Sequence, residues 1–108
     1  MSKGPSVAHI CGKDYSIVWE KGESLAGTDN VGYVSVSKCE VRIASGQHIQ
    51  QQRDTLLHEL LHIIWSEIGI GEVDPKDLTE ERVIRPLATA IIAALRDNPA
   101  LVRYLLSK

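Results

Sequence analysis

The sequence predicts an α+β domain in which a small, twisted antiparallel sheet precedes three helices. The main observation is a change of periodicity: residues 1–46 alternate as strands do, whereas residues 47–108 repeat at helical spacing. The length of 108 residues suits one domain with one hydrophobic core. A hydrophobic content of 44% and a charged content of 24% are ordinary for globular proteins, which excludes a disordered chain. We therefore treat residues 1–108 as a single domain.

Three or four short antiparallel strands are expected in the first half of the chain. The candidate segments span residues 7–11, 15–19, 31–37 and 40–44. The first two are apolar, β-branched or aromatic runs bounded by turn residues, and the last two alternate with period 2. In the last segment, the alternation places Val41 and Ile43 together on the inward face.

Three helices are expected in the second half. They span about residues 49–68, 78–96 and 99–106. Gly69 and Gly71 are expected to end the first helix in left-handed conformations. Asp77 has the position of an N-cap for the second helix, and Pro86 predicts a kink or a break within it. Asn98 is the expected N-cap of the third helix.

Charge and cysteine content limit the class of protein. The formal net charge of −2 lacks the basic excess that is usual for a nucleic-acid-binding domain. Cys11 and Cys39 are too few for a disulfide scaffold, and we expect both to be reduced and buried. The first residues lack the apolar segment of a secretory signal, and the apolar stretch at residues 87–95 is too short to cross a membrane. These features predict a cytoplasmic protein without a membrane or nucleic-acid partner.

Chemistry is indicated by His58-Glu59-Leu60-Leu61-His62, an HExxH pattern within the first predicted helix. Residues four apart lie on one face of a helix, so both imidazoles could reach a single Zn²⁺ ion. Glu59 projects about 100° from His58 around the helix. It could therefore reach a metal-bound water and act as its general base.

The surroundings of the two histidines favour a metal over ordinary core or surface histidines. Leu57, Leu60, Leu61 and Ile64 flank them, so we expect this helix to be largely buried. Two buried imidazoles and a buried carboxylate without partners would be costly, and a bound metal would remove that cost.

A third metal ligand is expected from the second helix, where Glu80 and Glu81 are the candidates. Glu80 fits a capping box with Asp77, whereas Glu81 shares a face with Ile84 and Ala88. We therefore prefer Glu81 and keep Glu80 as the alternative. The helix dipole favours an acidic first turn, which accounts for whichever glutamate is not a ligand.

With these residues in place, the chain resembles the small HExxH proteins of phages and mobile elements. The resemblance rests on TLLHELLH at residues 55–62, a glutamate near the start of the next helix, and RDNP at residues 96–99. Those proteins belong with the minimal gluzincins, zinc metallopeptidases in which a twisted sheet precedes an HExxH helix and a glutamate-bearing helix. The resemblance covers roughly residues 31–108. It implies that His58, His62 and Glu81 bind zinc and that Glu59 is catalytic.

The resemblance also implies where a protein or peptide substrate would bind. In zincins, the strand before the HExxH helix borders the cleft and pairs with an extended substrate. Here that strand is residues 40–44, with Val41, Arg42 and Ile43 as the substrate-binding residues. The chain departs from the family pattern at Pro86, which interrupts the glutamate-bearing helix, and in its small size, which leaves little room for substrate pockets.

Supporting residues are less clearly indicated. The candidates for stabilising a tetrahedral oxyanion, by residue type alone, are Tyr33, His48, Arg85 and Tyr104. Asp54 and Thr55 lie one turn before His58 and could orient an imidazole, although both could equally be surface residues.

Two functions of different classes follow. The first is a zinc-dependent metallopeptidase that hydrolyses a protein or peptide bond with a water activated by Glu59. The second is a non-catalytic module whose zinc ion stabilises a small fold and whose sheet edge binds a protein partner. Glu59 favours the first, because a structural site needs no base. A di-iron helical bundle is excluded, because it requires a second Glu-x-x-His pair and four long helices.

Overall fold

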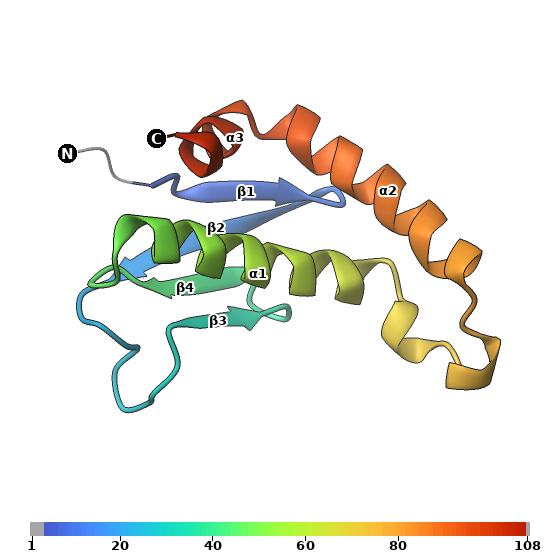
Figure 1. The fold of residues 1–108 in the computed structure, drawn as a ribbon, viewed down its shortest axis with the longest axis horizontal. Helices are drawn as coiled ribbons and strands as arrows, with labels where there is room; N and C mark the ends of the chain where they lie inside the picture. The colour runs from blue at the N-terminus through green and yellow to red at the C-terminus, as the bar shows by residue number, and fades with distance from the viewer. Residues whose placement is uncertain (1–3, 108) are drawn as a thin grey trace.

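A computed structural model of the chain describes residues 4–107 and shows a mixed α+β fold (Figure 1). The strands are β1 (Val7–Ile10), β2 (Lys13–Glu20), β3 (Gly32–Ser35) and β4 (Glu40–Ala44). The helices are α1 (Ile49–Glu67), α2 (Glu80–Asp97) and α3 (Pro99–Leu106), with two short 3-10 turns at Ile70–Glu72 and Pro75–Asp77. The change from strands to helices near residue 46 is therefore confirmed.

The four strands form one sheet in the order β1-β2-β4-β3. The pairs β1–β2 and β3–β4 are antiparallel, but β2 and β4 run parallel, with Ile17 beside Val41 and Trp19 beside Ile43. This corrects the prediction of a wholly antiparallel sheet. The physical reason is that β3 lies on the outer side of β4. The strand of the β3–β4 hairpin that pairs with β2 is therefore β4, which runs in the same direction as β2. Alternation within single segments carries no information about this order.

The turns between paired strands contain both cysteines. Cys11 and Gly12 both have positive φ, 50° and 79°, as expected for the two central residues of a type I′ hairpin turn. Cys39 also has a φ of 50° and ends the turn between β3 and β4. Cys11 is exposed and Cys39 is half-buried, so the prediction that both thiols are buried is wrong, although both are free.

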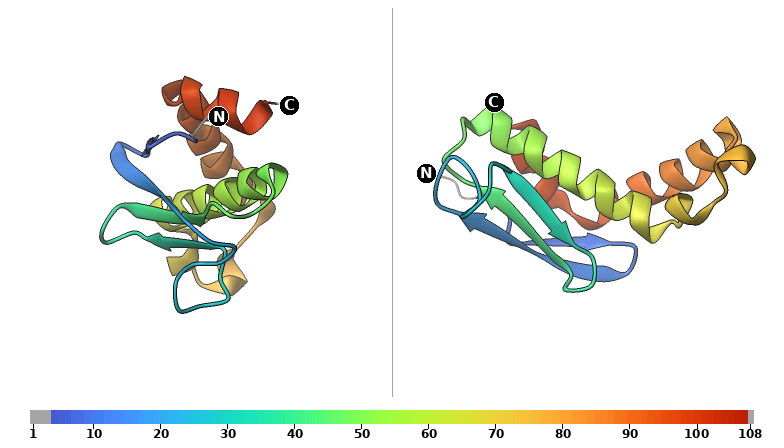
Figure 2. Two further views of the ribbon diagram at one scale, coloured as in Figure 1. Left: turned by 90° about the vertical axis from the view of Figure 1, so that its left-hand side faces the viewer. Right: turned by 90° about the horizontal axis from the view of Figure 1, so that it is seen from below.

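Helix α1 covers one face of the sheet, and the hydrophobic core lies between them (Figure 2). Leu56, Leu60, Ile63 and Ile64 point into this core. They meet the inward-facing residues of three strands, which are Ala8, Ile10, Tyr15, Ile17, Val41 and Ile43. The expected inward orientation of Val41 and Ile43 is confirmed, since both are fully buried.

Both ends of α1 are fixed by polar contacts. At its start, Nδ1 of His48 accepts a hydrogen bond from the Gln50 amide as an N-cap. At its end, Tyr15 donates its hydroxyl hydrogen to Glu67, and Lys13 forms an ion pair with the same carboxylate. Burial of the ring, and then the charge of Glu67, raises the pKa of Tyr15, so the phenol stays protonated as a donor. Gly69 follows in the predicted left-handed conformation, with a φ of 75°, but Gly71, for which the same conformation was predicted, does not adopt it.

Helix α2 begins at Glu80 and continues unbroken through Pro86 to Asp97. Its N-cap is Thr79, whose hydroxyl accepts from the Arg82 amide, and not Asp77, which belongs to the preceding 3-10 turn. No residue of α2 is fully buried. Within residues 4–107, neither α2 nor another helix is long and apolar enough to cross a membrane.

The junction between α2 and α3 is attached to the outer edge of β1 through Asn98. The side-chain oxygen of Asn98 accepts from the His9 amide at 2.8 Å, and its nitrogen donates to the His9 carbonyl at 2.8 Å. The same nitrogen donates to the Ala94 carbonyl at 2.7 Å. Asn98 precedes α3, as predicted, but its side chain does not cap that helix. Instead, the side-chain amide of Asn98 pairs with the backbone of His9, as one residue of a neighbouring strand would.

We predict that Asn98→Ala lowers the free energy of unfolding by about 2–3 kcal/mol, because the partly buried N–H and C=O groups of His9 lose their partners. Urea unfolding followed by circular dichroism measures this loss. The control is Asp97→Ala on the exposed neighbouring residue, which should change stability by less than about 0.5 kcal/mol. Similar small effects of both substitutions would contradict the role given to Asn98.

Candidate metal centre

His58 and His62 lie side by side on the outward face of α1. Their Nε2 atoms are 3.1 Å apart, and the ring centroids are 4.7 Å apart with the ring planes at 74°. The four-residue spacing on one helix therefore brings both imidazoles to one point, as the sequence predicts. The two nitrogens are also close enough for a hydrogen bond between the two rings.

The distance between the two nitrogens also fits a shared zinc ion. Zinc binds imidazole nitrogen at about 2.0–2.1 Å in tetrahedral geometry, which separates two such ligands by roughly 3.3 Å. The separation of 3.1 Å between the Nε2 atoms of His58 and His62 is close to this value. The two rings could accept a metal with little rearrangement.

The two histidines are exposed, because the buried side of α1 is formed by other residues. The prediction that both histidines are buried is therefore wrong, and a metal is not needed to offset the cost of burying them. Leu57 and Leu61, which were expected in the core, are 45% and 42% exposed and lie on the same outward side. The case for a metal at this position depends on the geometry of the two nitrogens and on what surrounds them.

Glu59 is half-buried and lines a cleft of about 380 Å³ together with His58. The cleft lies between the middle of α1 and the start of β3, and its other lining residues are Asn30, Val31, Gly32, Gln51, Asp54 and Thr55. Within the described residues, the Glu59 carboxylate has no hydrogen-bonded side-chain or backbone partner. It is therefore available to accept a proton from a water molecule in this cleft.

The close approach of α1 to β3 at this cleft depends on Gly32. A Cβ atom at this position would lie 2.7 Å from Cγ2 of Thr55 and 2.8 Å from Oε2 of Glu59. Both distances are shorter than real Cβ contacts, so a larger residue at position 32 would force Thr55 or Glu59 to move. No local sequence pattern indicates this role of Gly32, because it depends on a contact between segments far apart in the chain.

We predict that Gly32→Ala displaces Glu59 and lowers the free energy of unfolding by about 1–3 kcal/mol, because the added methyl group overpacks the contact between α1 and β3. Thermal and urea unfolding measure the change. Gly71→Ala is the matched control, since its Cβ would meet only Nε1 of Trp65 at an ordinary 3.7 Å. Equal stability of the two variants would show that Gly32 does not limit the packing.

Glu81, the predicted third ligand, does not lie beside the histidines. Its side chain is 76% exposed and forms an ion pair with Arg85 at 3.2 Å. Helix α2 begins beyond the C-terminal end of α1, whereas His58 and His62 lie near the middle of α1 (Figure 1). Among residues 4–107, no group of three or more His, Cys, Asp and Glu side chains is close enough to hold a metal.

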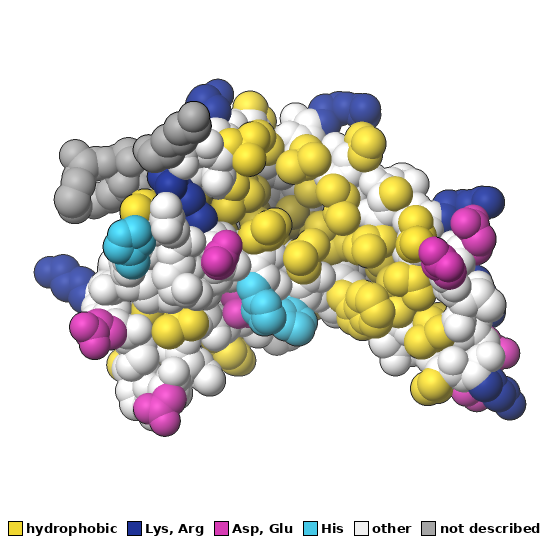
Figure 3. Space-filling view, in the orientation of Figure 1, with side chains coloured by type: hydrophobic (Ala, Val, Ile, Leu, Met, Phe, Trp, Pro, Cys, Tyr) yellow, Lys and Arg dark blue, Asp and Glu magenta, His cyan; other side chains and the backbone are white. Residues whose placement is uncertain are grey.

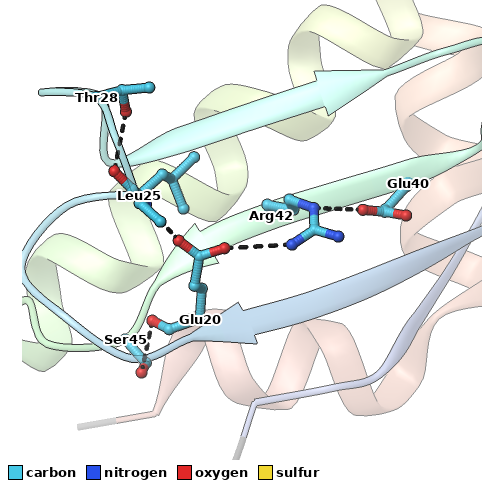
Figure 4. Close-up of polar contacts among 7 residues, drawn as sticks. Glu20, Leu25, Thr28, Glu40, Arg42 and Ser45 are labelled. Carbon is cyan, nitrogen blue, oxygen red and sulfur yellow. Dashed lines mark hydrogen bonds and ion pairs between the residues drawn. The ribbon is translucent and has the colours of Figure 1, made fainter.

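Strand β4 does not offer an edge to a substrate, contrary to the expectation for Val41, Arg42 and Ile43. It lies inside the sheet, with β2 on one side and β3 on the other. Val41 and Ile43 are buried in the core. Arg42 points to the opposite face of the sheet, where its guanidinium binds Glu40 and Glu20 (Figure 4). Both carboxylates raise the pKa of Arg42, and Glu40 contributes most.

The free edge beside the cleft belongs to β3. The Ala44 amide donates to the Val31 carbonyl at 2.9 Å, and Gly32 lies opposite Ile43. Backbone groups alternate in direction along an antiparallel strand. Gly32 and Val34 therefore direct their N–H and C=O groups away from β4, toward the open edge.

The supporting candidates are dispersed. The four oxyanion candidates, Tyr33, His48, Arg85 and Tyr104, do not line the cleft that holds Glu59. Thr55 lines the cleft, but its hydroxyl donates to Gln47. Asp54 also lines the cleft and is exposed, one helical turn before His58.

Residues on both sides of the histidines were not predicted to line the site. Asn30 and Gln51 bring side-chain amides to the polar cleft. On the other side, Leu61 and Trp65 join His58 and His62 around an apolar depression of about 290 Å³. For Gln51, Leu61 and Trp65, helical spacing from His58 was an available signal. Asn30 is brought near only by the packing of β3 on α1.

Comparison with protein-family models, with curated proteins and with solved structures finds no match for this chain.

Proposed function

We propose that this protein is a zinc-dependent peptidase of the minimal gluzincin type, acting on a protein or peptide in the cytoplasm. The observation that carries the proposal is the 3.1 Å separation of the Nε2 atoms of His58 and His62, beside a cleft that also holds Glu59. The free thiols of Cys11 and Cys39 are consistent with a reducing compartment.

Three side chains would divide the chemistry. His58 and His62 would hold the zinc ion through their Nε2 atoms. A bound zinc ion supplies Lewis acidity, which makes a water molecule more acidic and polarises a carbonyl group. Glu59 would accept the proton of the attacking water and then donate it to the leaving amine. Its lack of a hydrogen-bonded partner within the described residues leaves the carboxylate free for this transfer.

The edge of β3 would align the substrate. Gly32 and Val34 direct backbone donors and acceptors outward, so an extended peptide could add to the sheet as a further strand. At Gly32 such a peptide would pass beside Glu59, because a Cβ atom at Gly32 would lie only 2.8 Å from Oε2 of Glu59. This replaces β4 as the strand proposed to bind the substrate.

The alternative is a non-catalytic zinc module that binds a protein partner at the same sheet edge. It is favoured by the absence, among residues 4–107, of a third acidic, cysteine or histidine ligand beside the two histidines. The two functions make different demands on Glu59, since a structural site has no use for a base beside the metal.

We predict that Glu59→Gln abolishes hydrolysis and leaves zinc binding intact, because the amide cannot accept the proton while both imidazoles remain. The activity probe is unfolded casein with added zinc, analysed for new peptide termini by mass spectrometry. His62→Ala is the control that should lose both activity and zinc. Cleavage by the Glu59→Gln protein equal to that of the wild type would contradict the catalytic role.

A further inference from the structure

A broad apolar surface lies between α1 and α2, on the face that Figure 3 shows. Its hollow has a volume of about 250 Å³ and is lined almost entirely by aliphatic side chains from α1, α2, α3 and β1. Six large apolar residues of this surface are between 41% and 56% exposed. They are Leu57, Leu61, Trp65, Ile84, Ile92 and Leu95.

This surface is as large as the largest apolar patch of a typical monomer, and such patches are often functional. From their fractional exposure, the six residues present roughly 500 Å² of apolar area, within the range of about 300–600 Å² for the largest patch on a typical monomer. A stable interface buries about 800 Å² on each partner, so this surface could supply most of one. The radius of gyration of 14.5 Å also exceeds the value of about 13 Å expected for a compact domain of this length.

Helix α2 packs Leu87 and Ile91 against the core but leaves part of its apolar side uncovered. Its 18 residues include none that is fully buried, although one side is strongly apolar. Helices of this length gain most of their stability from packing an apolar face. On α2, an exposed row of Ile84, Ala88 and Ile92 runs along the side that remains uncovered.

We propose that a second copy of this chain covers this surface, with the two α2 helices packed antiparallel about a two-fold axis at Ala88. The exposed row is symmetric about this residue, because Ile84 and Ile92 each lie four positions away. In the antiparallel arrangement, Ile84 of each copy meets Ile92 of the other. The small side chain of Ala88 lets the helices approach closely at the axis. A surface that is its own complement is what a two-fold dimer requires.

The same arrangement brings a glutamate to the histidines. Glu81 and Leu95 both lie seven residues from Ala88, so the partner's Glu81 is level with Leu95. Leu95 lines the apolar hollow together with Leu57 and Leu61, the residues adjacent in sequence to His58 and His62. Glu81 also lies about two helical turns before Ala88 on the same side. The third zinc ligand, absent from the described single chain, is thus supplied by the second copy; this step depends on the proposed zinc site.

Light scattering during size-exclusion chromatography tests the dimer. Wild-type protein should have twice the mass of one chain, and Ala88→Arg should have the mass of one chain because a charged side chain at the axis prevents contact. Ala93→Arg is the matched control, an exposed alanine of α2 on the opposite side of the helix, and should remain dimeric. A monomeric wild type, or a dimeric Ala88→Arg protein, overturns the proposal. The wild-type mass decides the question even if the variant does not fold.

Zinc binding in mixtures tests the shared ligand. His62→Ala lacks one imidazole and Glu81→Gln lacks the carboxylate, so each variant alone should lose tight zinc binding in competition with a coloured chelator. Unfolded together and refolded, they form mixed dimers in which one site is complete, and tight binding should return. Glu80→Gln alone should bind as the wild type does.

The outcomes separate this inference from the proposed function. A dimer whose mixed variants do not recover zinc overturns the shared site. A wild type that binds zinc as a monomer overturns the dimer and leaves the zinc site in place. A wild type that binds no zinc overturns the shared site together with the proposed function.

Discussion

The structure depends on how helix α1 divides its side chains between two environments. Leu56, Leu60 and Ile63 pack on the sheet and fix the rotation of the helix about its axis. That rotation directs His58 and His62 outward and turns Glu59 toward β3, since all these positions share one helical period. The packing of the core therefore sets the geometry of the proposed metal site, and Gly32 allows the helix to come close enough.

Local features of the fold could be predicted from the sequence, because they depend on neighbouring residues. The bounds of α1 and α3, the inward faces of Val41 and Ile43 and the left-handed Gly69 were all predicted. The parallel pairing of β2 with β4 was not, because strand order depends on contacts between segments far apart in sequence. The start of α2 was misplaced because both Asp77 and Thr79 suit an N-cap, and only the structure distinguishes them.

In the candidate site, too, local features could be predicted and those that depend on distant contacts could not. His58, Glu59 and His62 lie within one helix, so their spacing predicts that the two imidazoles meet. The exposure of the histidines could not be read from that spacing, since it depends on which side of α1 meets the sheet. Glu81 lies on a different helix whose position is set by Asn98 and by residues 69–79, and no local pattern encodes that position. The proposed two-fold pairing of α2 reconciles its placement with the role that the family resemblance implies.

The zinc content of the purified protein tests the central claim most directly. Wild-type protein and His62→Ala are dialysed against metal-free buffer after zinc addition, and bound metal is measured by elemental analysis. The geometry of His58 and His62 predicts about one zinc ion per wild-type chain and none in the variant. Wild-type protein that retains no zinc would contradict this. The two histidines would then be exposed residues joined by a hydrogen bond, and the peptidase would have no metal.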